Sequence, residues 1–495
     1  MSGVHSNELS AGVGDRQVDP RRWWILVLLC GMQFMILLDM TIVNVALPDI
    51  QESLGFTEAG LTWVVNGYVL MSGGLLLLGG RTADIFGRRK LLMIGVGLFA
   101  VSSILAGAAT STGMMITGRI GQGIAEAIAA PASLGLIALL FTDPAERTKA
   151  LGAWGGITAL AGTLGYVISG LLTDMASWRW IFYINIPIAI LVLALIPRMV
   201  SESKMVREKD AGLDVGGAIT STSGLFAIVY GLLQAVDHPW GSAAVVLPLT
   251  LGVALFLAML IIERRAKNPL IPLRFFANRT RSVINAASLF FMAAFISYTF
   301  MLTLFMQQVL DYSSLRTGLS WLPLGFGIGI GIGIGTALIP KVGVKAVAAV
   351  GFAGAGVGLF LTSMISVDTT YLGGILPGMI LFGVFAGASM PAATNAALHG
   401  VTEQDSGLAS GVQTTALQVG SALGLAVLVT LALRDAMGEV QQGVDVDVAM
   451  TAGYGSALRV GAVLMVIGAV LVALLLEHVA TKLRDPVAEM VEHAA

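Results

Sequence analysis

Fourteen apolar runs, each about 20 residues long or somewhat longer, alternate with shorter polar segments along the chain. A helix of about 20 apolar residues crosses the hydrocarbon core of a bilayer, so each run predicts one membrane span. A single strand would leave its backbone groups unpaired in lipid, which makes a helix the expected form of every span. The predicted spans lie near residues 23–47, 60–79, 91–109, 113–139, 150–172, 180–197, 213–233, 244–262, 282–309, 317–339, 344–365, 371–398, 405–433 and 455–476.

The basic residues are distributed unevenly between alternate loops. Most of the 28 Lys and Arg residues fall in the termini and in every second loop, including 81–90, 198–209 and 264–281. The loops between these carry only three: Arg179, Arg316 and Arg434. Because short cytoplasmic loops are enriched in Lys and Arg, this pattern predicts an even number of spans and two cytoplasmic termini.

An internal repeat divides the chain. Gly118, Gly123 and Pro131 recur as Gly378, Gly383 and Pro391, each 260 residues further on, and Gly87 recurs as Gly343 after 256 residues. Such offsets predict two homologous halves, a common organisation in transporters. We therefore expect an all-α membrane protein with two six-helix bundles and an inserted helix pair. Its predicted parts are an N-terminal tail (1–22), a first half (23–198), a linker with the inserted pair (199–262), a second half (263–478) and a C-terminal tail (479–495).

One predicted span contains alternating glycine and isoleucine between residues 325 and 335. On a helix, Gly327, Gly331 and Gly335 share one face at four-residue spacing. Small residues at this spacing let membrane helices approach closely. We expect this face to be a packing seam.

Composition supports the membrane class and excludes several others. Hydrophobic residues make up 56% of the chain and charged residues 12%, about half the charged share of a soluble domain, and the mean hydropathy is +0.85. A net charge of −2, without a basic block interleaved with aromatic residues, gives no reason to expect nucleic acid as a partner. Cys30 is the only cysteine, so no intramolecular disulfide can form. The five histidines lack the spacing of metal ligands, and we expect no metal and no cofactor.

Ionisable residues within two of the spans are the candidate functional groups. Asp39 lies inside the first apolar run, and Arg119, Gln122 and Glu126 share one face of the fourth span. Counting about 1.5 Å per residue along each helix places Asp39 and Arg119 at similar depths. Intramembrane charges are expensive and are usually retained for function. The alternatives are an aspartate that reaches the outer headgroups, a structural ion pair at Arg119 and a satisfied packing pair at Glu126.

Seven motifs in order along the chain carry a resemblance to a known family. They are residues 38–48 (Leu-Asp-Met-Thr-Ile-Val-Asn-Val-Ala-Leu-Pro), Trp63 with Tyr68, the loop 80–90, residues 119–123, residues 178–187, residues 268–276, and Gln307-Gln308 followed by Gly318-Leu319 and Leu322-Pro323. In this combination the chain resembles the fourteen-span drug:proton antiporters of the major facilitator superfamily, and among them the actinobacterial multidrug and antibiotic exporters.

The resemblance implies roles for particular residues. It assigns proton coupling to Asp39, Arg119 and Glu126, although Glu126 occupies a position where the family usually has a small residue. A conformational latch falls on Gly80, Asp84, Gly87, Arg88 and Arg89. In the family the aspartate of this loop engages the other half in the outward-open state, and Gly80 and Gly87 are expected to allow a tight turn. Simple topogenic charge is the alternative explanation for the basic residues.

The latch loop and the fifth span depart from the family pattern. Thr82 and Ile85 stand where a leucine and an arginine are common. The export signature Gly-Pro-x-x-Gly-Gly reads Gly-Tyr-Val-Ile-Ser-Gly at 165–170, which weakens the inference about transport direction. We expect Gly162, Gly165 and Gly170 to permit close packing of this span.

Candidate substrate contacts combine aromatic and amide side chains, and the chain also has 22 methionines, which adapt in shape. Interhelical packing is the alternative role for each of them. The candidates are Asn44, Asn66, Tyr68, Gln122, Trp154, Tyr298, Gln307, Trp321, Asn395, Gln413 and Gln418.

Together these features predict a multi-pass transporter of the cytoplasmic membrane. We expect a proton-coupled antiporter that exports small amphipathic drugs or antibiotics by alternating access, with no catalytic residue. Its expected partners are the substrate, protons and membrane lipid, with no obligatory protein partner. The alternatives are a proton-coupled exporter or importer of another small metabolite and, from a different class, a membrane enzyme or sensor.

Overall fold

The structure is a computed structural model that describes residues 20–200, 202, 214–266, 269, 273–401 and 406–477. This part of the chain consists of helices and their connections, without a strand. Both predicted tails lie almost entirely outside it. The first group of helices comprises α1 (Arg22–Leu54), α2 (Glu58–Phe86), α3 (Arg88–Gly107), α4 (Thr112–Leu140), α5 (Pro144–Met175), α6 (Trp180–Tyr183) and α7 (Asn185–Met199).

Two long helices and a short turn connect the first group to the last. They are α8 (Val215–Gln234), α9 (Ala243–Arg265) and η1 (Leu273–Ala277). The last group comprises α10 (Arg279–Leu304), η2 (Phe305–Val309), α11 (Ser314–Ser320), α12 (Leu322–Thr362), η3 (Tyr371–Ile375), α13 (Leu376–Ala397), α14 (Ser406–Gln441) and α15 (Val446–Leu475).

Thirteen helical stretches in the described residues are long and apolar enough to cross a membrane. The stretch Ser314–Thr362 covers two predicted spans, because two helices meet there at Gly343, where φ is 85° and ψ is 159°. Gly87 has a similar backbone, with φ 110°, between α2 and α3. A side chain rarely tolerates positive φ, so the repeated glycine marks the same sharp turn in both groups. The helical membrane fold predicted from the hydropathy pattern is confirmed.

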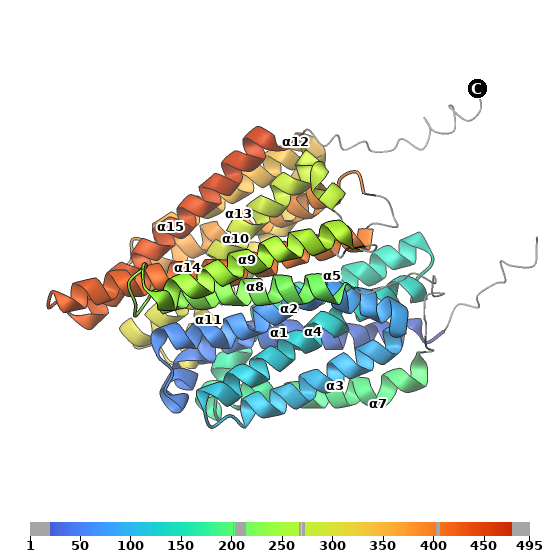
Figure 1. The fold of residues 1–495 in the computed structure, drawn as a ribbon, viewed down its shortest axis with the longest axis horizontal. Coiled ribbons are helices and arrows are strands. Elements are labelled where there is room, and N and C mark those ends of the chain that lie inside the picture. Colours follow the sequence, from blue (N-terminus) through green and yellow to red (C-terminus); the bar gives the residue numbers. More distant parts are fainter. Residues whose placement is uncertain are drawn as a thin grey trace, which may run out of the picture.

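The helices lie side by side along one direction (Figure 1). The first group (blue to teal) forms the lower part of the view, the last group (yellow to red) forms the upper part, and α8 and α9 (green) lie across the front between them. We call the end where α1 begins and α15 ends the near end, and the opposite end, where α1 ends and α2 begins, the far end. The near end is at the right in Figure 1.

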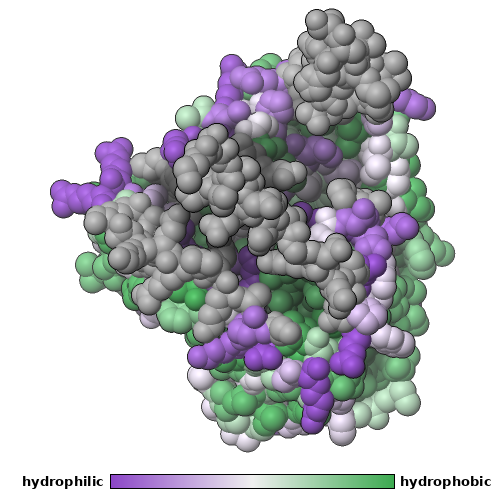
Figure 2. Space-filling model, turned by 90° about the vertical axis from the view of Figure 1, so that its right-hand side faces the viewer, coloured by the Kyte–Doolittle hydropathy of each residue, from purple (hydrophilic) through white to green (hydrophobic). Residues whose placement is uncertain are grey.

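The surface has a polar near end and apolar sides. Hydrophilic residues gather on the near end, whereas green, hydrophobic residues cover the flanks below it (Figure 2). Large apolar side chains such as Phe326, Leu247 and Leu474 are 65 to 71% exposed. Such exposure suits a surface in contact with lipid acyl chains, where water is absent.

The glycine face of α12 is a packing seam, as predicted. Gly327, Gly331 and Gly335 are buried and lie against the backbone of α13. A Cβ atom on Gly331 would lie 2.0 Å from the carbonyl oxygen of Val384, and one on Gly335 would lie 2.3 Å from that of Ala388. Only glycine therefore fits at these two positions.

Replacing Gly331 by alanine is expected to destabilise the fold by about 1–3 kcal/mol, because the added methyl group must push two backbones apart. Gly333→Ala is the matched control, since a Cβ there meets nothing within 4 Å and alanine favours the helix by about 0.5–1 kcal/mol. Thermal unfolding of the purified variants measures the difference. Equal melting temperatures for the two variants would contradict the seam.

Candidate functional site

Asp39 is the centre of a buried polar cluster formed by α1, α3, α4 and α7. Its side chain has no exposed surface. Oδ2 accepts a hydrogen bond from Nη1 of Arg119 at 2.5 Å, and Oδ1 accepts from the side-chain amides of Gln122 and Asn185, both at 2.7 Å. Taking an aspartate and an arginine out of water costs several kcal/mol per ion. Three donors on one carboxylate offset that cost.

Arg119 is fixed from three sides. Its Nε donates to the carbonyl oxygen of Val64 in α2 at 2.7 Å, and Nη1 also donates to Oε1 of Gln122 at 2.8 Å. The guanidinium carbon lies 4.4 Å from the centre of the Tyr68 ring, a cation–π contact. Arg119 and Gln122 are one turn apart on α4, so both reach Asp39 from the same face. Arg119 therefore joins α1, α2 and α4 through one side chain.

Glu126 lies two turns beyond Arg119 on the same face of α4. It is 8% exposed, and its Oε2 has no hydrogen-bond partner. Ser72, Tyr68, Asp39 and Arg119 surround its carboxyl group, but neither Ser72 nor Tyr68 forms a hydrogen bond of good geometry with it. The Tyr68 hydroxyl also lacks a hydrogen-bond partner of good geometry. Compared with Asp39, Glu126 is the less completely satisfied carboxylate.

Two members of the cluster, Asn185 and Ser103, were missed by sequence reasoning. Asn185 begins α7 and is fully buried, and Ser103 of α3 accepts a hydrogen bond from Gln122 at 2.9 Å. Asn185 falls within the motif 178–187, and a buried amide inside an apolar run is a signal that could have found it. Ser103 gives no such signal, because serines are common in membrane helices.

The loop between α2 and α3 is folded onto the first group of helices. Asp84 forms an ion pair with Arg88 at 2.7 Å, and Nη1 of Arg88 donates to the carbonyl oxygen of Gly135 in α4 at 2.9 Å. In this arrangement the Asp84–Arg88 pair therefore holds the loop within its own group. The expected turn at Gly80 is wrong. Gly80 lies inside α2, which continues to Phe86, so Gly87 alone makes the turn.

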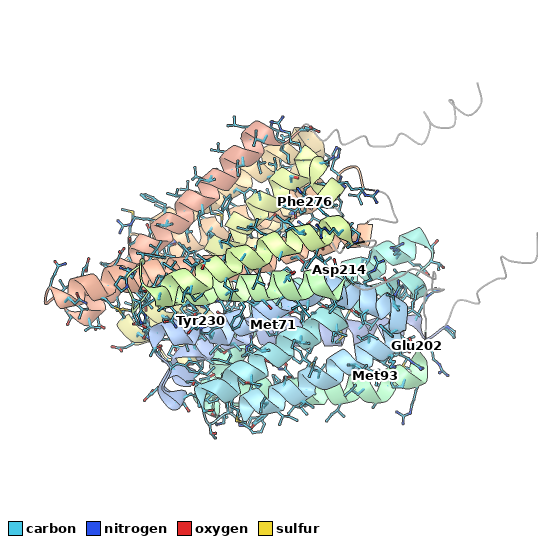
Figure 3. All side chains as sticks on the ribbon, viewed as in Figure 1. Met71, Met93, Glu202, Asp214, Tyr230 and Phe276 are labelled. Atoms are coloured by element: carbon cyan, nitrogen blue, oxygen red, sulfur yellow. The ribbon has the colours of Figure 1, made fainter. Side chains whose placement is uncertain are left out.

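Glu202 lies outside α3 in the sequence and caps the N-terminus of that helix. Its carboxylate accepts from the backbone N–H groups of Arg89 at 3.2 Å and Lys90 at 3.1 Å, and Arg89 forms an ion pair with it at 3.7 Å. Figure 3 shows Glu202 at the near end of the first group. A carboxylate at a helix N-terminus satisfies orphan N–H groups and the helix dipole. The latch loop is thus tied to the chain that leads toward the inserted pair.

Most of the candidate substrate contacts are buried. Asn44, Asn66, Tyr68, Gln122, Tyr298, Trp321 and Gln418 are at most 6% exposed. Trp154, Gln307 and Gln413 are partly exposed and Asn395 is exposed. Gln307 donates to the carbonyl oxygen of Val45 across the two groups at 2.7 Å, whereas Asn395 bonds Pro391 in its own helix at 2.7 Å. The buried candidates and the exposed candidates therefore do not line one common surface in this arrangement.

The tyrosine of the altered signature in α5 makes a contact between the two groups. The ring of Tyr166 stacks on Trp321 with centroids 5.2 Å apart, and Trp321 meets Tyr298 edge-on at 5.7 Å. A Cβ on Gly170 would lie 2.3 Å from the carbonyl oxygen of Ser314, so α5 and α11 are also closely packed. Gly165 packs against the side chain of Thr41 in α1. A Cβ on Gly162 would meet nothing within 4 Å among the described residues, so the expectation of close packing at Gly162 is wrong.

The two groups are joined at the far end by hydrogen bonds. Asp49 accepts from the Ser314 hydroxyl at 3.0 Å, and Asp174 accepts from the backbone N–H of Leu315 at 3.0 Å. Gln308 donates to Gln51 at 3.1 Å. The far end of the boundary between the groups is therefore closed.

No group of three or more His, Cys, Asp or Glu side chains in the described residues is placed to hold a metal ion.

The fold and the site define a multi-pass helical membrane protein with an ion pair buried between its helices. The model of the Major Facilitator Superfamily matches residues 29–425, and the chain belongs to this family, whose members transport small molecules. It is 38% identical to a puromycin resistance protein of Streptomyces alboniger, over 83% of this chain and 82% of that protein. It is also 38% identical to a lincomycin resistance protein of Streptomyces lincolnensis, over 84% of this chain and 86% of that protein.

Among solved structures, the chain is similar to a bacterial homologue of the human lysosomal transporter Spinster in an inward-facing, unoccupied conformation. The TM-score is 0.64 at 16% identity, and the match covers 92% of this chain and 96% of that one. This similarity shows the fold.

Proposed function

We propose that the protein is a proton-coupled antiporter that exports small amphipathic drugs or antibiotics across the cytoplasmic membrane. The observation that carries the proposal is the buried Asp39–Arg119 ion pair, with Glu126 beside it holding an unpartnered carboxylate oxygen. The relatives named for puromycin and lincomycin resistance support the substrate class.

The proposed mechanism uses the difference between the two carboxylates. Asp39 and Arg119 neutralise each other, while Glu126 takes up a proton from outside and later releases it inside. The added proton changes the electrostatic potential at Arg119 and Tyr68. This change weakens substrate binding and favours release of the substrate outside. Antiport requires only that proton and substrate affinities differ between the two states of the transporter. No cofactor enters the cycle, because the proton gradient drives it.

The orientation follows from the basic residues. Arg88, Arg89 and Lys90 begin α3 and Arg264 and Arg265 end α9, all at the near end. The positive-inside rule assigns that end to the cytoplasm. The far end, joined through Asp49 and Asp174, is then the outer side. Export then requires the far-end hydrogen bonds to break.

The remaining predicted residues receive roles within this cycle. Asp84, Gly87, Arg88 and Arg89 form the latch loop, in which Asp84 exchanges Arg88 for a partner in the last group when the near end closes. We assign the substrate contacts to those candidates that lie at the boundary between the two helix groups. Alternating access exposes this boundary first to one side of the membrane and then to the other.

A resistance panel in an efflux-deficient host tests the function. The wild-type protein is expected to raise the inhibitory concentration of at least one compound in a panel that includes puromycin and lincomycin. Asp39→Asn and Glu126→Gln are expected to abolish that increase. Asp435→Asn, which changes an exposed carboxylate in the C-terminal part of α14, is expected to retain it. Accumulation of substrate in proteoliposomes against its own concentration gradient that is unchanged when no proton gradient is imposed would disprove the coupling.

A further inference from the structure

The inserted helix pair is attached to the last group through the side chains of Thr430 and Arg434 in α14. The Thr430 hydroxyl donates to the carbonyl oxygen of Leu232 in α8 at 3.0 Å. Nη1 of Arg434 donates to the carbonyl oxygen of Ala235 at 2.6 Å and to that of His238 at 3.2 Å. Thr430 and Arg434 are one turn apart on α14, so both side chains reach the same end of α8.

The acceptors lie at and just after the C-terminus of α8, which Ala235 caps. The last carbonyl groups of a helix lack partners within it and form the negative end of its dipole. A guanidinium group that donates to them is therefore stabilising, and charge-assisted hydrogen bonds are about twice as strong as neutral ones. The guanidinium carbon of Arg434 also lies 5.6 Å from the centre of the Trp240 ring, in the connection between α8 and α9. Arg434 thus holds both the end of α8 and the turn that follows it.

The contact between the pair and the first group is of a different kind. The Trp63 ring of α2 packs on the Phe226 ring of α8 with centroids 4.7 Å apart. Nearer the middle of both helices, a Cβ on Gly74 of α2 would lie 2.3 Å from the hydroxyl oxygen of Thr222. That hydroxyl is buried and has no hydrogen-bond partner among the described residues. These contacts between α2 and α8 therefore depend on van der Waals packing.

α8 lies over the boundary between the two helix groups. At this boundary α2 and α14 pack directly against each other, since a Cβ on Gly73 would lie 2.4 Å from Cβ of Gln418. α8 contacts both of these helices, and with α9 it lies across the front of the boundary (Figure 1). When the two groups move relative to each other, α8 has to keep one of its two contacts and shift at the other.

Hydrogen bonds and apolar contacts respond differently to such a movement. A hydrogen bond requires a donor–acceptor distance of about 2.7–3.2 Å and weakens steeply at poor angles. Separating Thr430 and Arg434 from α8 would leave polar groups unpaired, which is expensive in a membrane. Van der Waals contacts are individually weak, and those of Trp63 with Phe226 can be exchanged for contacts with neighbouring apolar atoms. The contact between α8 and α2 is therefore the one that shifts.

We propose that Thr430 and Arg434 are positioning residues that fix the inserted helix pair to the last group. The pair moves with α14, slides over α2 and keeps the boundary between the two groups covered while they rock. This inference gives the inserted pair a mechanical role. It goes beyond the proposed function and does not depend on which carboxylate carries the proton.

Distances between spin labels test which group the pair follows. Labels are attached, two at a time and in a Cys30→Ala background, through Val101→Cys in α3, Leu257→Cys in α9 and Val463→Cys in α15, at positions that are 57 to 64% exposed. Between low and high pH, the distance from α9 to α15 is expected to stay constant, whereas the distance from α9 to α3 changes together with that from α3 to α15. A changing distance from α9 to α15 with a constant distance from α9 to α3 would overturn the inference.

Arg434→Met is expected to loosen the pair and to add a second population to the distance from α9 to α15. Loss of a hydrogen bond from a charged donor lowers the ratio of attached to detached molecules by about tenfold to a hundredfold. Arg434→Lys, which keeps a charged donor, is expected to restore most of the single population. Arg459→Met is the matched control, because this exposed arginine of α15 bonds only Gly455 within its own helix in the described structure. An unchanged distance in the double variant Thr430→Val, Arg434→Met would contradict the roles of both residues.

Reversible cross-links test the same movement in transport and leave Arg434 in place. A short thiol-reactive linker joins α8 to α14 through Leu232→Cys and Thr430→Cys, so that a covalent link replaces the hydrogen bond that is lost. The same linker joins α8 to α2 through Trp63→Cys and Phe226→Cys. Substrate efflux is expected to continue with the first link and to stop with the second until reduction cleaves the linker. Continued efflux with α8 linked to α2, or efflux lost with α8 linked to α14, would show that the pair does not move with the last group.

Discussion

Replacing Glu126 by glutamine is expected to reduce proton-driven accumulation of substrate by about 5- to 150-fold, the usual range of coupling between two sites. The glutamine keeps the shape of the side chain but cannot gain or lose a proton. Substrate exchange across the membrane without a gradient is expected to continue, because alternating access does not require the proton. Uptake of labelled substrate into inverted vesicles, with and without an imposed pH gradient, separates the two activities.

The control for this experiment is Asp435→Asn, which removes an exposed carboxylate of α14 that has no part in the cluster. It is expected to accumulate substrate as the wild type does. Accumulation by Glu126→Gln at the wild-type level would show that another group carries the proton. Loss of both accumulation and exchange would show that Glu126 is needed for folding or binding.

Removing Arg119 is expected to destabilise the protein by about 3–5 kcal/mol, because Asp39 is left charged and buried without its main partner. Arg119→Met keeps much of the side-chain volume. Combining it with Asp39→Asn removes the uncompensated charge and is expected to recover most of the lost stability. Transport is expected to stay absent in both variants. Thermal unfolding of the purified proteins in detergent measures the stability, and vesicle uptake measures transport.

Arg22→Met provides the comparison with a less buried pair. Arg22 forms an ion pair with Glu146 at 2.7 Å, and the two side chains are 17% and 30% exposed. Pairs in contact with water contribute about 0–1 kcal/mol. A double variant as unstable as Arg119→Met alone would contradict the assignment of the instability to the buried charge of Asp39.

The helices were predictable because one physical rule governs them. A chain in lipid has to satisfy its backbone within each span, so hydropathy marks the helices with few exceptions. The run at 371–398 corresponds to η3 and α13, which cover Tyr371–Ala397. The repeat predicted an equivalence of Gly87 and Gly343, and both have positive φ. The misplaced turn at Gly80 has a local cause: α2 continues through a polar segment, which hydropathy cannot distinguish from a loop.

The site was predictable only in part. A depth count along two helices placed Asp39 near Arg119, and the structure pairs them at 2.5 Å. Such a count gives the depth of each residue in the membrane. It does not show which neighbouring helix packs between the two residues. The positions of Asn185 of α7 and Ser72 of α2 beside the site depend on how the helices pack laterally, and no spacing within one helix encodes that packing. The stack of Tyr166 on Trp321 joins residues 155 apart in sequence for the same reason.

Direct measurement of proton movement tests the central claim most simply. Proteoliposomes containing a pH-sensitive dye are loaded with a substrate found in the resistance panel and diluted into substrate-free buffer. The account predicts that substrate leaving the wild-type vesicles drives protons in the opposite direction, and that Glu126→Gln moves substrate without moving protons. Substrate efflux through the wild-type protein with no accompanying proton flux would contradict it.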